Sequence, residues 1–318
     1  MKLAFDARCN NGKTSSFNRV LELWKNAAHS VELDFSEWHG DDYCNADVLM
    51  SPNSDIATVQ GPIKVATLHD VNPIQPQPSS WIRRAPAIHA LNKTARNLQL
   101  NADHIITGCD FAKQSISKAF PALANKLFVV PHYPSPAFSR GEVNQQLLQQ
   151  HGLPENCVLF VSAIRKHKNW SGLLDAWSAL PLEMQRAHPL VFVASAKKVR
   201  RKIKSPHVLF TEHITDEVLL HLYRSAKIMV FPSFAEGFGL PPLEALASGC
   251  KVISSNATCL PEVLGDSVDY FDPFSTEQLT TLLSQHLGTN DLGDAQASPQ
   301  WSAELTGNKL KELLNYIK

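Results

Sequence analysis

The segment from Phe231 to Gly249 combines two glutamates, three glycines and two adjacent prolines within a short stretch. The apolar residues at its start predict a strand, and the prolines predict a helix start, where a missing amide hydrogen costs least. Gly237 and Gly239 allow the backbone to approach a ligand closely, while a helix start offers amide hydrogens and the positive end of the helix dipole to an anion. A diphosphate group fits this arrangement.

The two glutamates of this segment are expected to act on different groups. Glu236 falls in the turn and Glu244 falls inside the predicted helix, so the two carboxylates need not compete for one position. Each can accept hydrogen bonds from its own set of hydroxyl groups. The alternative is a glycine turn followed by a surface helix without a ligand.

The segment resembles the retaining glycosyltransferases of family 4, which have the GT-B fold. Glu236 and Glu244 match the E-x7-E signature of that family, and the resemblance extends over residues 208–273. It implies that Glu236 is a catalytic residue that contacts the donor hexose, and that Glu244 binds the ribose hydroxyls. It also implies that the donor sugar and phosphates are bound by the backbone amides of Gly237, Phe238, Gly239 and Leu240.

A second constellation is the basic stretch of residues 161–170, where a strand leads into a loop and then into a helix. Lys168 at this helix start is a point charge suited to a leaving diphosphate, so we expect it to be catalytic. Family members carry Arg-Lys-Asn here, and His167 stands at the position of the arginine. Arg165 or Lys166 would supply the missing cation, and we assign Arg165 to donor binding. The alternative is a solvated basic loop.

The N-terminal half resembles the family less closely. The stretch Thr67-Leu68-His69-Asp70 is similar to its His-Asp motif, which implies that His69 is a catalytic residue facing the donor sugar. A histidine after a strand can also be purely structural. The glycine-rich loop usual after the first strand is reduced to residues 10–13.

Two further stretches bear on the acceptor. Residues 81–100 mix aromatic, apolar and basic side chains, which suit contact with a lipid-linked acceptor at a membrane surface, or an ordinary amphipathic helix packed on its domain. We favour the packed helix. The dense basic run of residues 197–204 suits a solvated loop, which we favour, or a contact with a phosphorylated or membrane-borne substrate.

The elements that must position these groups follow an α/β pattern. Short apolar runs rich in β-branched residues alternate with helical patterns, which is typical of parallel sheets buried on both faces. Prolines cluster in residues 130–136 and predict a linker. We therefore expect two Rossmann-like domains facing each other across a cleft: residues 1–135 on the acceptor side, residues 136–300 binding the nucleotide sugar, and a C-terminal helix in residues 301–318 that packs back on the first domain. Strands are expected at residues 2–5, 47–50, 64–68, 104–107, 127–130, 158–162, 190–193, 207–210, 228–231 and 251–254.

Composition narrows the class of protein. The chain has 318 residues, 44% apolar and 19% charged, without a run of about 20 apolar residues that would span a membrane. The apolar run at the start of the sequence is too short and too polar for a signal peptide, so we expect a cytoplasmic protein. Peripheral contact at the inner face of the membrane is left open. Its six cysteines lack the spacing of a disulfide framework or a zinc site, and a net charge of zero gives no reason to expect nucleic acid.

The sequence thus predicts a retaining hexosyltransferase that moves mannose or glucose from a nucleoside diphosphate sugar to a glycan or glycolipid hydroxyl. We expect no cofactor and no metal, because cationic side chains can replace a metal ion and no Asp-x-Asp site precedes the donor loop. The alternatives are a nucleotide-sugar-binding protein of the same fold with weak or no catalysis, and a nucleotide-sugar epimerase of GT-B type.

Overall fold

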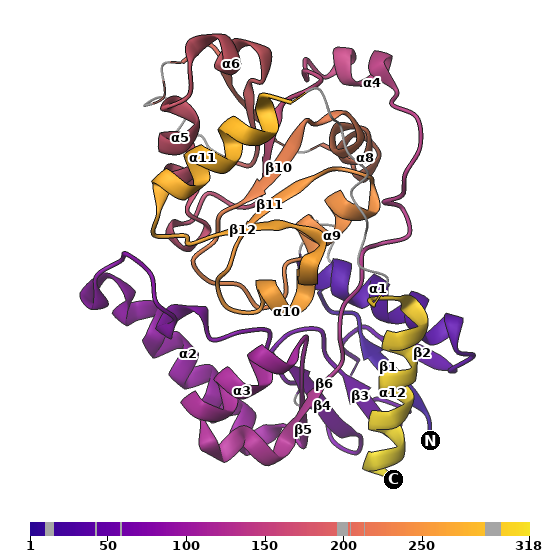
Figure 1. Ribbon diagram of the computed structural model, residues 1–318. Coiled ribbons are helices and arrows are strands. Elements are labelled where there is room, and N and C mark those ends of the chain that lie inside the picture. Colours follow the sequence, from indigo (N-terminus) through magenta and orange to yellow (C-terminus); the bar gives the residue numbers. More distant parts are fainter. Residues whose placement is uncertain are drawn as a thin grey trace. The chain divides into compact units, whose positions relative to one another are not determined.

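The chain divides into two compact units in the computed structural model (Figure 1). Unit 1 comprises residues 1–133 together with 299–318, and unit 2 comprises residues 134–298. The structure describes residues 1–9, 16–41, 43–57, 59–195, 203, 205–212, 214–289 and 300–318. The reduced loop at residues 10–13 and all of the basic run except Ile203 lie outside this description.

Unit 1 is built on a parallel sheet whose described strands follow the order β2-β1-β3-β4-β5-β6. The inner strands β1 and β3 are buried along their whole length. Such strands read as continuous apolar runs because helices cover both faces of a parallel sheet. The strands are β1 (Leu3–Asp6), β2 (Phe35–Trp38), β3 (Val48–Met50), β4 (Ile63–Thr67), β5 (His104–Thr107) and β6 (Leu127–Val129).

The C-terminal helix α12 (Ala303–Ile317) packs against α1 (Ser16–Ser30), although the two helices stand at opposite ends of the sequence (Figure 1). Gly307 makes this close approach possible, because a side chain there would collide with the carbonyl oxygen of Ala27. The hydroxyl of Thr306 donates to the carbonyl of Pro131 at 2.9 Å, which ties α12 to the end of β6. The other helices of unit 1 are η1 (Asn72–Ile74), α2 (Trp81–Asn101), α3 (Asp110–Ala119) and η2 (Pro121–Lys126).

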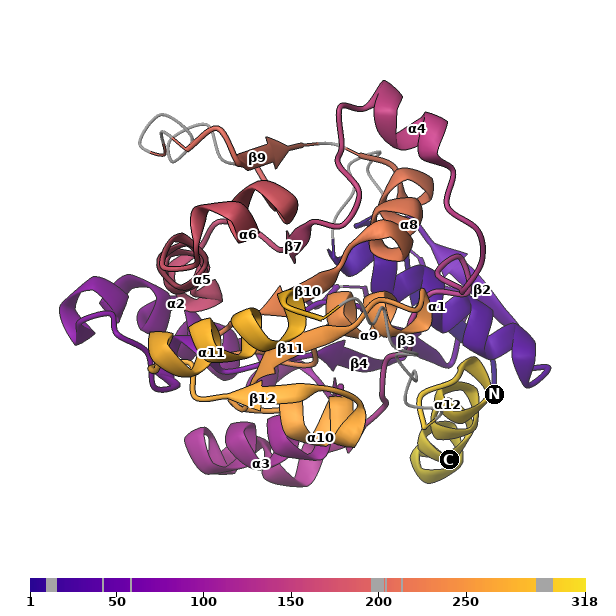
Figure 2. The same cartoon turned by 45° about the horizontal axis from the view of Figure 1, so that its top comes forward.

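Unit 2 repeats the architecture with a parallel sheet whose described strands follow the order β12-β11-β10-β7-β8-β9. Helices α5 and α11 lie side by side against one face of this sheet (Figure 2), and the buried Trp177 and Leu283 belong to the same core cluster. The strands are β7 (Val158–Val161), β8 (Leu190–Val193), β9 (Val208–Thr211), β10 (Ile228–Phe231), β11 (Val252–Ser255) and β12 (Asp269–Phe271). The helices are α4 (Gln145–Gln150), η3 (Lys166–Lys168), α5 (Trp170–Ser178), α6 (Leu182–Ala187), α8 (Asp216–Ser225), α9 (Leu240–Ala247), α10 (Leu260–Leu264), η4 (Gly265–Ser267) and α11 (Thr276–Leu287).

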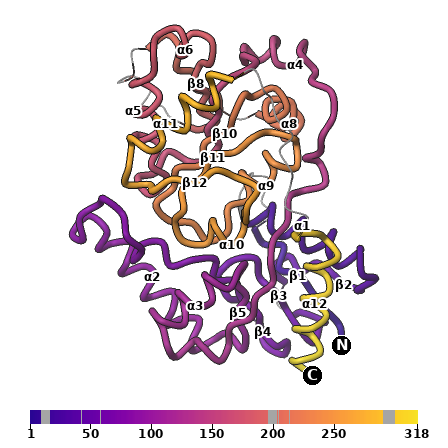
Figure 3. The backbone as a smooth tube through the Cα atoms, viewed as in Figure 1, coloured from indigo at the N-terminus to yellow at the C-terminus, as the bar shows by residue number. Residues whose placement is uncertain are grey.

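The segment that leads from β6 to α4 can be followed in Figure 3, and it is hydrogen-bonded to side chains of α8. The guanidinium of Arg224 donates to the carbonyl oxygens of Ser139, Arg140 and Glu142 at 2.9–3.2 Å. The amide of Asn144 donates to the imidazole of His221 at 3.0 Å. An arginine suits this position because its fork of N–H donors can satisfy several carbonyls that no strand or helix pairs.

The expected α/β class is confirmed, and every strand expected from the sequence is present with its ends shifted by at most two residues. The prediction missed β2 and β12, which both lie at sheet edges. An edge strand has one neighbour and is partly exposed, so its residues lack the continuous apolar run that identifies an inner strand. β2, for example, has the sequence Phe-Ser-Glu-Trp and buries only its last residue fully.

Candidate functional site

The glycine-bearing loop connects β10 to α9 with the geometry that the sequence predicts. Gly239 has a φ of +96°, and a Cβ atom there would lie 2.9 Å from Cδ2 of Leu260. A side chain is therefore strained by the backbone conformation, and its Cβ would also require the Leu260 side chain to shift. The first turn of α9 contains Pro241 and Pro242, which lack amide hydrogens. Donors for an anion must therefore come from Leu240 and from the loop before it.

Glu236 and Lys168 form an ion pair at the start of this loop. Nζ of Lys168 lies 2.7 Å from each carboxylate oxygen of Glu236. The side chains of Lys168 and Glu236 are only 17% and 8% exposed. The alternative of a solvated loop lysine is therefore wrong for Lys168. The sequence assigned Lys168 to a leaving diphosphate and Glu236 to a sugar. In the structure these two side chains contact each other.

A conformational restraint at Asn169 fixes where Lys168 points. Asn169 has a φ of +49°, a conformation in which asparagine is enriched among non-glycine residues. Its side-chain amide donates to the carbonyl of Pro273 at 3.0 Å, and its Oδ1 lies so close to Gly172 that a Cβ there would be 2.5 Å away. The asparagine of the resembled Arg-Lys-Asn motif thus turns the chain from η3 into α5.

His167 links the two loops but does not supply the cation that it replaces. Its backbone carbonyl accepts a hydrogen bond from the amide of Phe234 at 2.7 Å. Burial, followed by the nearby charge of Lys168, lowers the pKa of the His167 imidazole to about 4. The ring is therefore neutral at pH 7. Arg165 and Lys166 are exposed on the same loop, where either side chain is accessible to a ligand.

Glu244 lies in α9, the helix that follows this loop, and is fully buried. The hydroxyl of Ser248, one turn on, donates to the Glu244 backbone carbonyl at 2.8 Å. A ligand can reach the carboxylate only where local rearrangement makes this side chain accessible. The binding of ribose hydroxyls by Glu244 stays a prediction.

Two residues without a predicted role, Thr258 and Cys259, form hydrogen bonds with the backbone of the glycine-bearing loop. The amide of Glu236 donates to Oγ1 of Thr258 at 3.0 Å. The thiol of Cys259 donates to the carbonyl oxygens of Glu236 and Phe238 at 3.4 and 3.5 Å. No spacing rule joins positions so far apart in the chain, so only the fold brings them together.

His69 follows β4 in unit 1, whereas Lys168, Glu236 and the glycine loop belong to unit 2. Its Nε2 lies 2.9 Å from the carbonyl oxygen of Pro52, which can only accept, so this nitrogen carries the proton. Burial lowers the pKa of His69 below its ordinary value of 6.5. At neutral pH the ring therefore presents Nδ1 as a hydrogen-bond acceptor. The ring of Phe17 stacks on the His69 ring with 5.8 Å between the ring centroids, and the centroid of the His132 ring lies 5.6 Å from that of His69.

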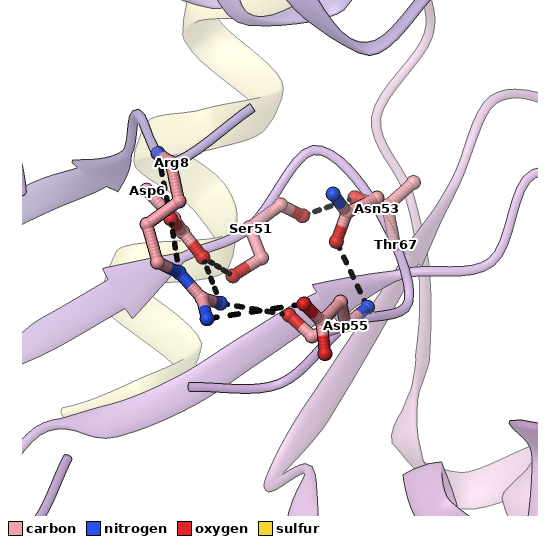
Figure 4. Close-up of polar contacts among 6 residues, drawn as sticks. All are labelled: Asp6, Arg8, Ser51, Asn53, Asp55 and Thr67. Atoms are coloured by element: carbon pink, nitrogen blue, oxygen red, sulfur yellow. Dashed lines mark hydrogen bonds and ion pairs between the residues drawn. The ribbon is translucent and has the colours of Figure 1, made fainter. Parts of the chain in front are cut away.

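A second polar cluster lies at the carboxyl ends of β1 and β3 in unit 1 (Figure 4). The carboxylate of Asp6 is buried and accepts from the guanidinium of Arg8 at 2.7 and 2.9 Å, and from the hydroxyl of Ser51 at 2.6 Å. Arg8 also donates to the backbone carbonyl of Asp55, and Thr67 donates to that of Ser51. These bonds satisfy one another and hold the turn after β1. The sequence signal was an acid and an arginine flanking one residue at a strand end.

Helix α2, which carries the candidate acceptor contacts, is packed only along its second half. Leu91, Ala95 and Leu98 are its buried residues, whereas Trp81 and Ile82 are 64% and 87% exposed. Its face at Trp81, Ile82, Ala85, Ile88, His89 and Asn92 lines a groove of about 420 Å³. The interpretation as an ordinary packed helix therefore fits residues 91–101 but not the first turns.

Among the described residues, no group of three or more His, Cys, Asp or Glu side chains is arranged to hold a metal ion. None of the helices in the described ranges has both the length and the apolar character needed to cross a membrane.

Comparisons with known proteins agree with the fold. Residues 144–292 match the family described as "Glycosyl transferases group 1". The chain is 31% identical to the serotype-specific mannosyltransferase WbdA of Escherichia coli over 214 residues, which are 64% of this chain and 25% of WbdA. It is 28% identical to the O-antigen chain mannosyltransferase B of Escherichia coli over 247 residues, covering 70% of this chain and 61% of that protein. The chain therefore spans about a quarter of WbdA.

Solved structures share the fold at low identity. HepE of Anabaena, solved in complex with UDP-glucose, superimposes with a TM-score of 0.75 at 15% identity, covering 99% of this chain and 100% of HepE. WaaG, a glycosyltransferase involved in lipopolysaccharide biosynthesis, superimposes with a TM-score of 0.68 at 16% identity, covering 98% and 95% of the two chains. The expected GT-B fold class is confirmed by these likenesses.

Proposed function

We propose that the chain transfers a hexose from a nucleoside diphosphate sugar to a glycan or glycolipid hydroxyl, because residues 144–292 match the family of group 1 glycosyl transferases. We propose retention at the anomeric carbon, on the resemblance to family 4. Mannose is the proposed hexose, because the relatives WbdA and O-antigen chain mannosyltransferase B are named as mannosyltransferases. The same names support a bacterial surface glycan as the acceptor.

The observation that carries this proposal is the Lys168–Glu236 ion pair beside the glycine loop. Each of these two mostly buried charges satisfies the other, which avoids the large cost of an unpaired buried charge. A donor presents a diphosphate, which competes for Lys168, and sugar hydroxyls, which can donate to Glu236. Binding of the donor would therefore exchange one ion pair for two charge-assisted contacts.

Departure of the diphosphate is the step that these residues favour. Negative charge develops on the leaving phosphate, and Lys168 with the amides of residues 237–240 stabilises that charge in a preorganised site. Retention would then follow if the leaving phosphate guides the acceptor hydroxyl onto the same face of the sugar, as the family resemblance implies.

Arg165 is proposed as the additional cation for the diphosphate, because it is exposed on the loop of Lys168, whereas burial lowers the pKa of His167 to about 4. Together with Lys168 it would take the place of a metal ion. Transfer is therefore expected to persist in excess EDTA. A loss of activity on chelation that Mg²⁺ or Mn²⁺ restores would contradict this part of the proposal.

The proposal is tested in two stages. The first measures thermal stabilisation by GDP, UDP, dTDP and ADP, since a ligand that binds only the native state raises its stability. The second supplies the mannose and glucose esters of the nucleoside diphosphate that binds, and follows the product by proton NMR. An α-linked product from an α-linked donor is expected. A β-linked product would overturn retention, and binding without transfer or donor hydrolysis would favour the alternative of a nucleotide-sugar-binding protein.

A further inference from the structure

The segment of residues 258–260 contacts the donor loop of residues 236–239 at several points. It runs from the loop after β11 into the first residue of α10, and its first residue, Thr258, has a φ of +54°. A β-branched residue with positive φ is a genuine outlier, because its side chain collides with the backbone in that conformation. Such a conformation is energetically unfavourable and persists only where the surrounding structure imposes it.

The conformation of Thr258 is coupled to Glu236 by a hydrogen bond. Oγ1 of Thr258 accepts the amide proton of Glu236 at 3.0 Å. This amide lies in the loop between β10 and α9, outside any strand or helix, and the threonine side chain satisfies it. The bond fixes the backbone of Glu236, from which its carboxylate extends to Lys168.

The next two residues restrain the rest of the loop. The buried thiol of Cys259 donates to the carbonyls of Glu236 and Phe238, and a methyl group of Leu260 fills the space beside Gly239. Both backbone polar groups of Glu236 are thus engaged by side chains of residues 258 and 259. The carboxylate is held by Lys168, so Glu236 is restrained at three points.

We propose that Thr258 is a positioning residue, whose hydroxyl holds Glu236 in the geometry that sugar transfer requires. This inference rests on the proposed function, because it assigns Glu236 to the reacting sugar. The threonine acts through Glu236 and is not assigned a contact with the donor. A positioning role predicts that kcat falls when the hydroxyl is removed, while donor binding by the loop amides and Lys168 is largely kept.

Three substitutions separate the hydroxyl from the backbone strain. Thr258→Ser keeps the hydroxyl, and Thr258→Val keeps the branched shape but removes it. Thr258→Gly removes it and also releases the strain, because glycine adopts positive φ readily. The value of a neutral hydrogen bond predicts that kcat falls about three- to tenfold in the valine and glycine variants, and less than about twofold in the serine variant. Donor KM is expected to change less than about twofold in all three.

The glycine variant distinguishes positioning from a merely structural role. Release of strain offsets the lost hydrogen bond, so its Tm should stay close to that of the wild type while kcat falls. A structural role predicts that activity follows stability, with the glycine variant as active as the wild type. Wild-type kcat in the valine variant, or a serine variant as slow as the valine variant, would overturn the proposal.

Hydrogen–deuterium exchange at the Glu236 amide supplies a readout that does not depend on activity. Exchange should be about two- to tenfold faster in Thr258→Val than in the wild type, and unchanged in Thr258→Ser. If the wild-type protein transfers no sugar but this exchange pattern is found, the proposed function fails and the restraint of Glu236 by Thr258 stands. If transfer is found but exchange is equal in all variants, the positioning role fails alone.

Discussion

Replacement of Lys168 by alanine is expected to lower both activity and stability, and the stability change can be worked out from the ion pair. Two unit charges 2.7 Å apart attract by about 6 kcal/mol at an effective dielectric constant of 20. Desolvation of both groups opposes much of this attraction, and the partial exposure of Lys168 screens it further. Fully buried pairs that lose one partner cost about 3–5 kcal/mol, and exposed pairs at most about 1 kcal/mol. For this intermediate case we expect a loss of about 1–3 kcal/mol.

The assay is a thermal unfolding series with a double-mutant cycle. A loss of that size corresponds to a fall in Tm of about 3–9 °C for a domain of this length. Lys168→Ala leaves the Glu236 carboxylate buried without its counter-charge, whereas Lys168→Ala combined with Glu236→Gln leaves no buried charge. The double variant should therefore be more stable than Lys168→Ala alone. Lys166→Ala removes an exposed lysine two residues away and serves as the matched control, with an unchanged Tm.

Activity is measured on the same proteins. Loss of one preorganised group that stabilises a leaving anion typically lowers kcat about 100- to 1,000-fold, and we expect a loss in this range for Lys168→Ala but not for Lys166→Ala. The ion-pair reasoning would be refuted if the Lys168→Ala protein had the wild-type Tm. It would also be refuted if the stability losses of Lys168→Ala and Glu236→Gln simply added in the double variant. Unchanged kcat/KM would refute the role of Lys168 in diphosphate departure.

Three other perturbations follow from the geometry. Gly239→Ala places a methyl group against a leucine side chain at positive φ, so it should lower both Tm and donor affinity. Gly265→Ala is also at positive φ but has open space around it, so it should lower Tm less and leave donor affinity unchanged. Equal donor affinities in the two variants would contradict this expectation. Glu236→Gln should lower kcat, and Glu244→Gln should raise donor KM by at most about a hundredfold, which steady-state kinetics with saturating acceptor measures; changes in KM alone for both would remove the catalytic role of Glu236. Burial lowers the pKa of His132 to about 3, so between pH 6.5 and 3 the unfolded chain binds a proton that the folded chain does not, and stability falls as the pH falls. The decrease in Tm from pH 7 to pH 5 should therefore be smaller in His132→Gln than in the wild type, and an equal decrease would show that His132 does not contribute.

The sequence alone predicted the features that depend on near neighbours in the chain. The strand, glycine turn and helix from Ile228 to Gly249 are specified locally, because glycine and proline restrict the backbone wherever they stand. Gly239 and Gly249 indeed have positive φ values of +96° and +89°. The inner strands were predictable for a similar reason, since burial on both faces requires an uninterrupted apolar run.

The tertiary structure decided which distant residues meet. Lys168 and Glu236 are 68 residues apart in the chain. Their motifs predicted that Lys168 binds the diphosphate and Glu236 binds the sugar, but did not predict that the two side chains form an ion pair. The restraint of Glu236 by Thr258 and Cys259, and the contact of Gly307 with α1, likewise join segments that no local pattern relates. Backbone preferences act over a few residues, whereas ion pairs, hydrogen bonds and close packing form wherever the folded chain brings two groups within a few ångströms. The sequence therefore determined the elements and the kind of chemistry, and the fold determined how Glu236 is held.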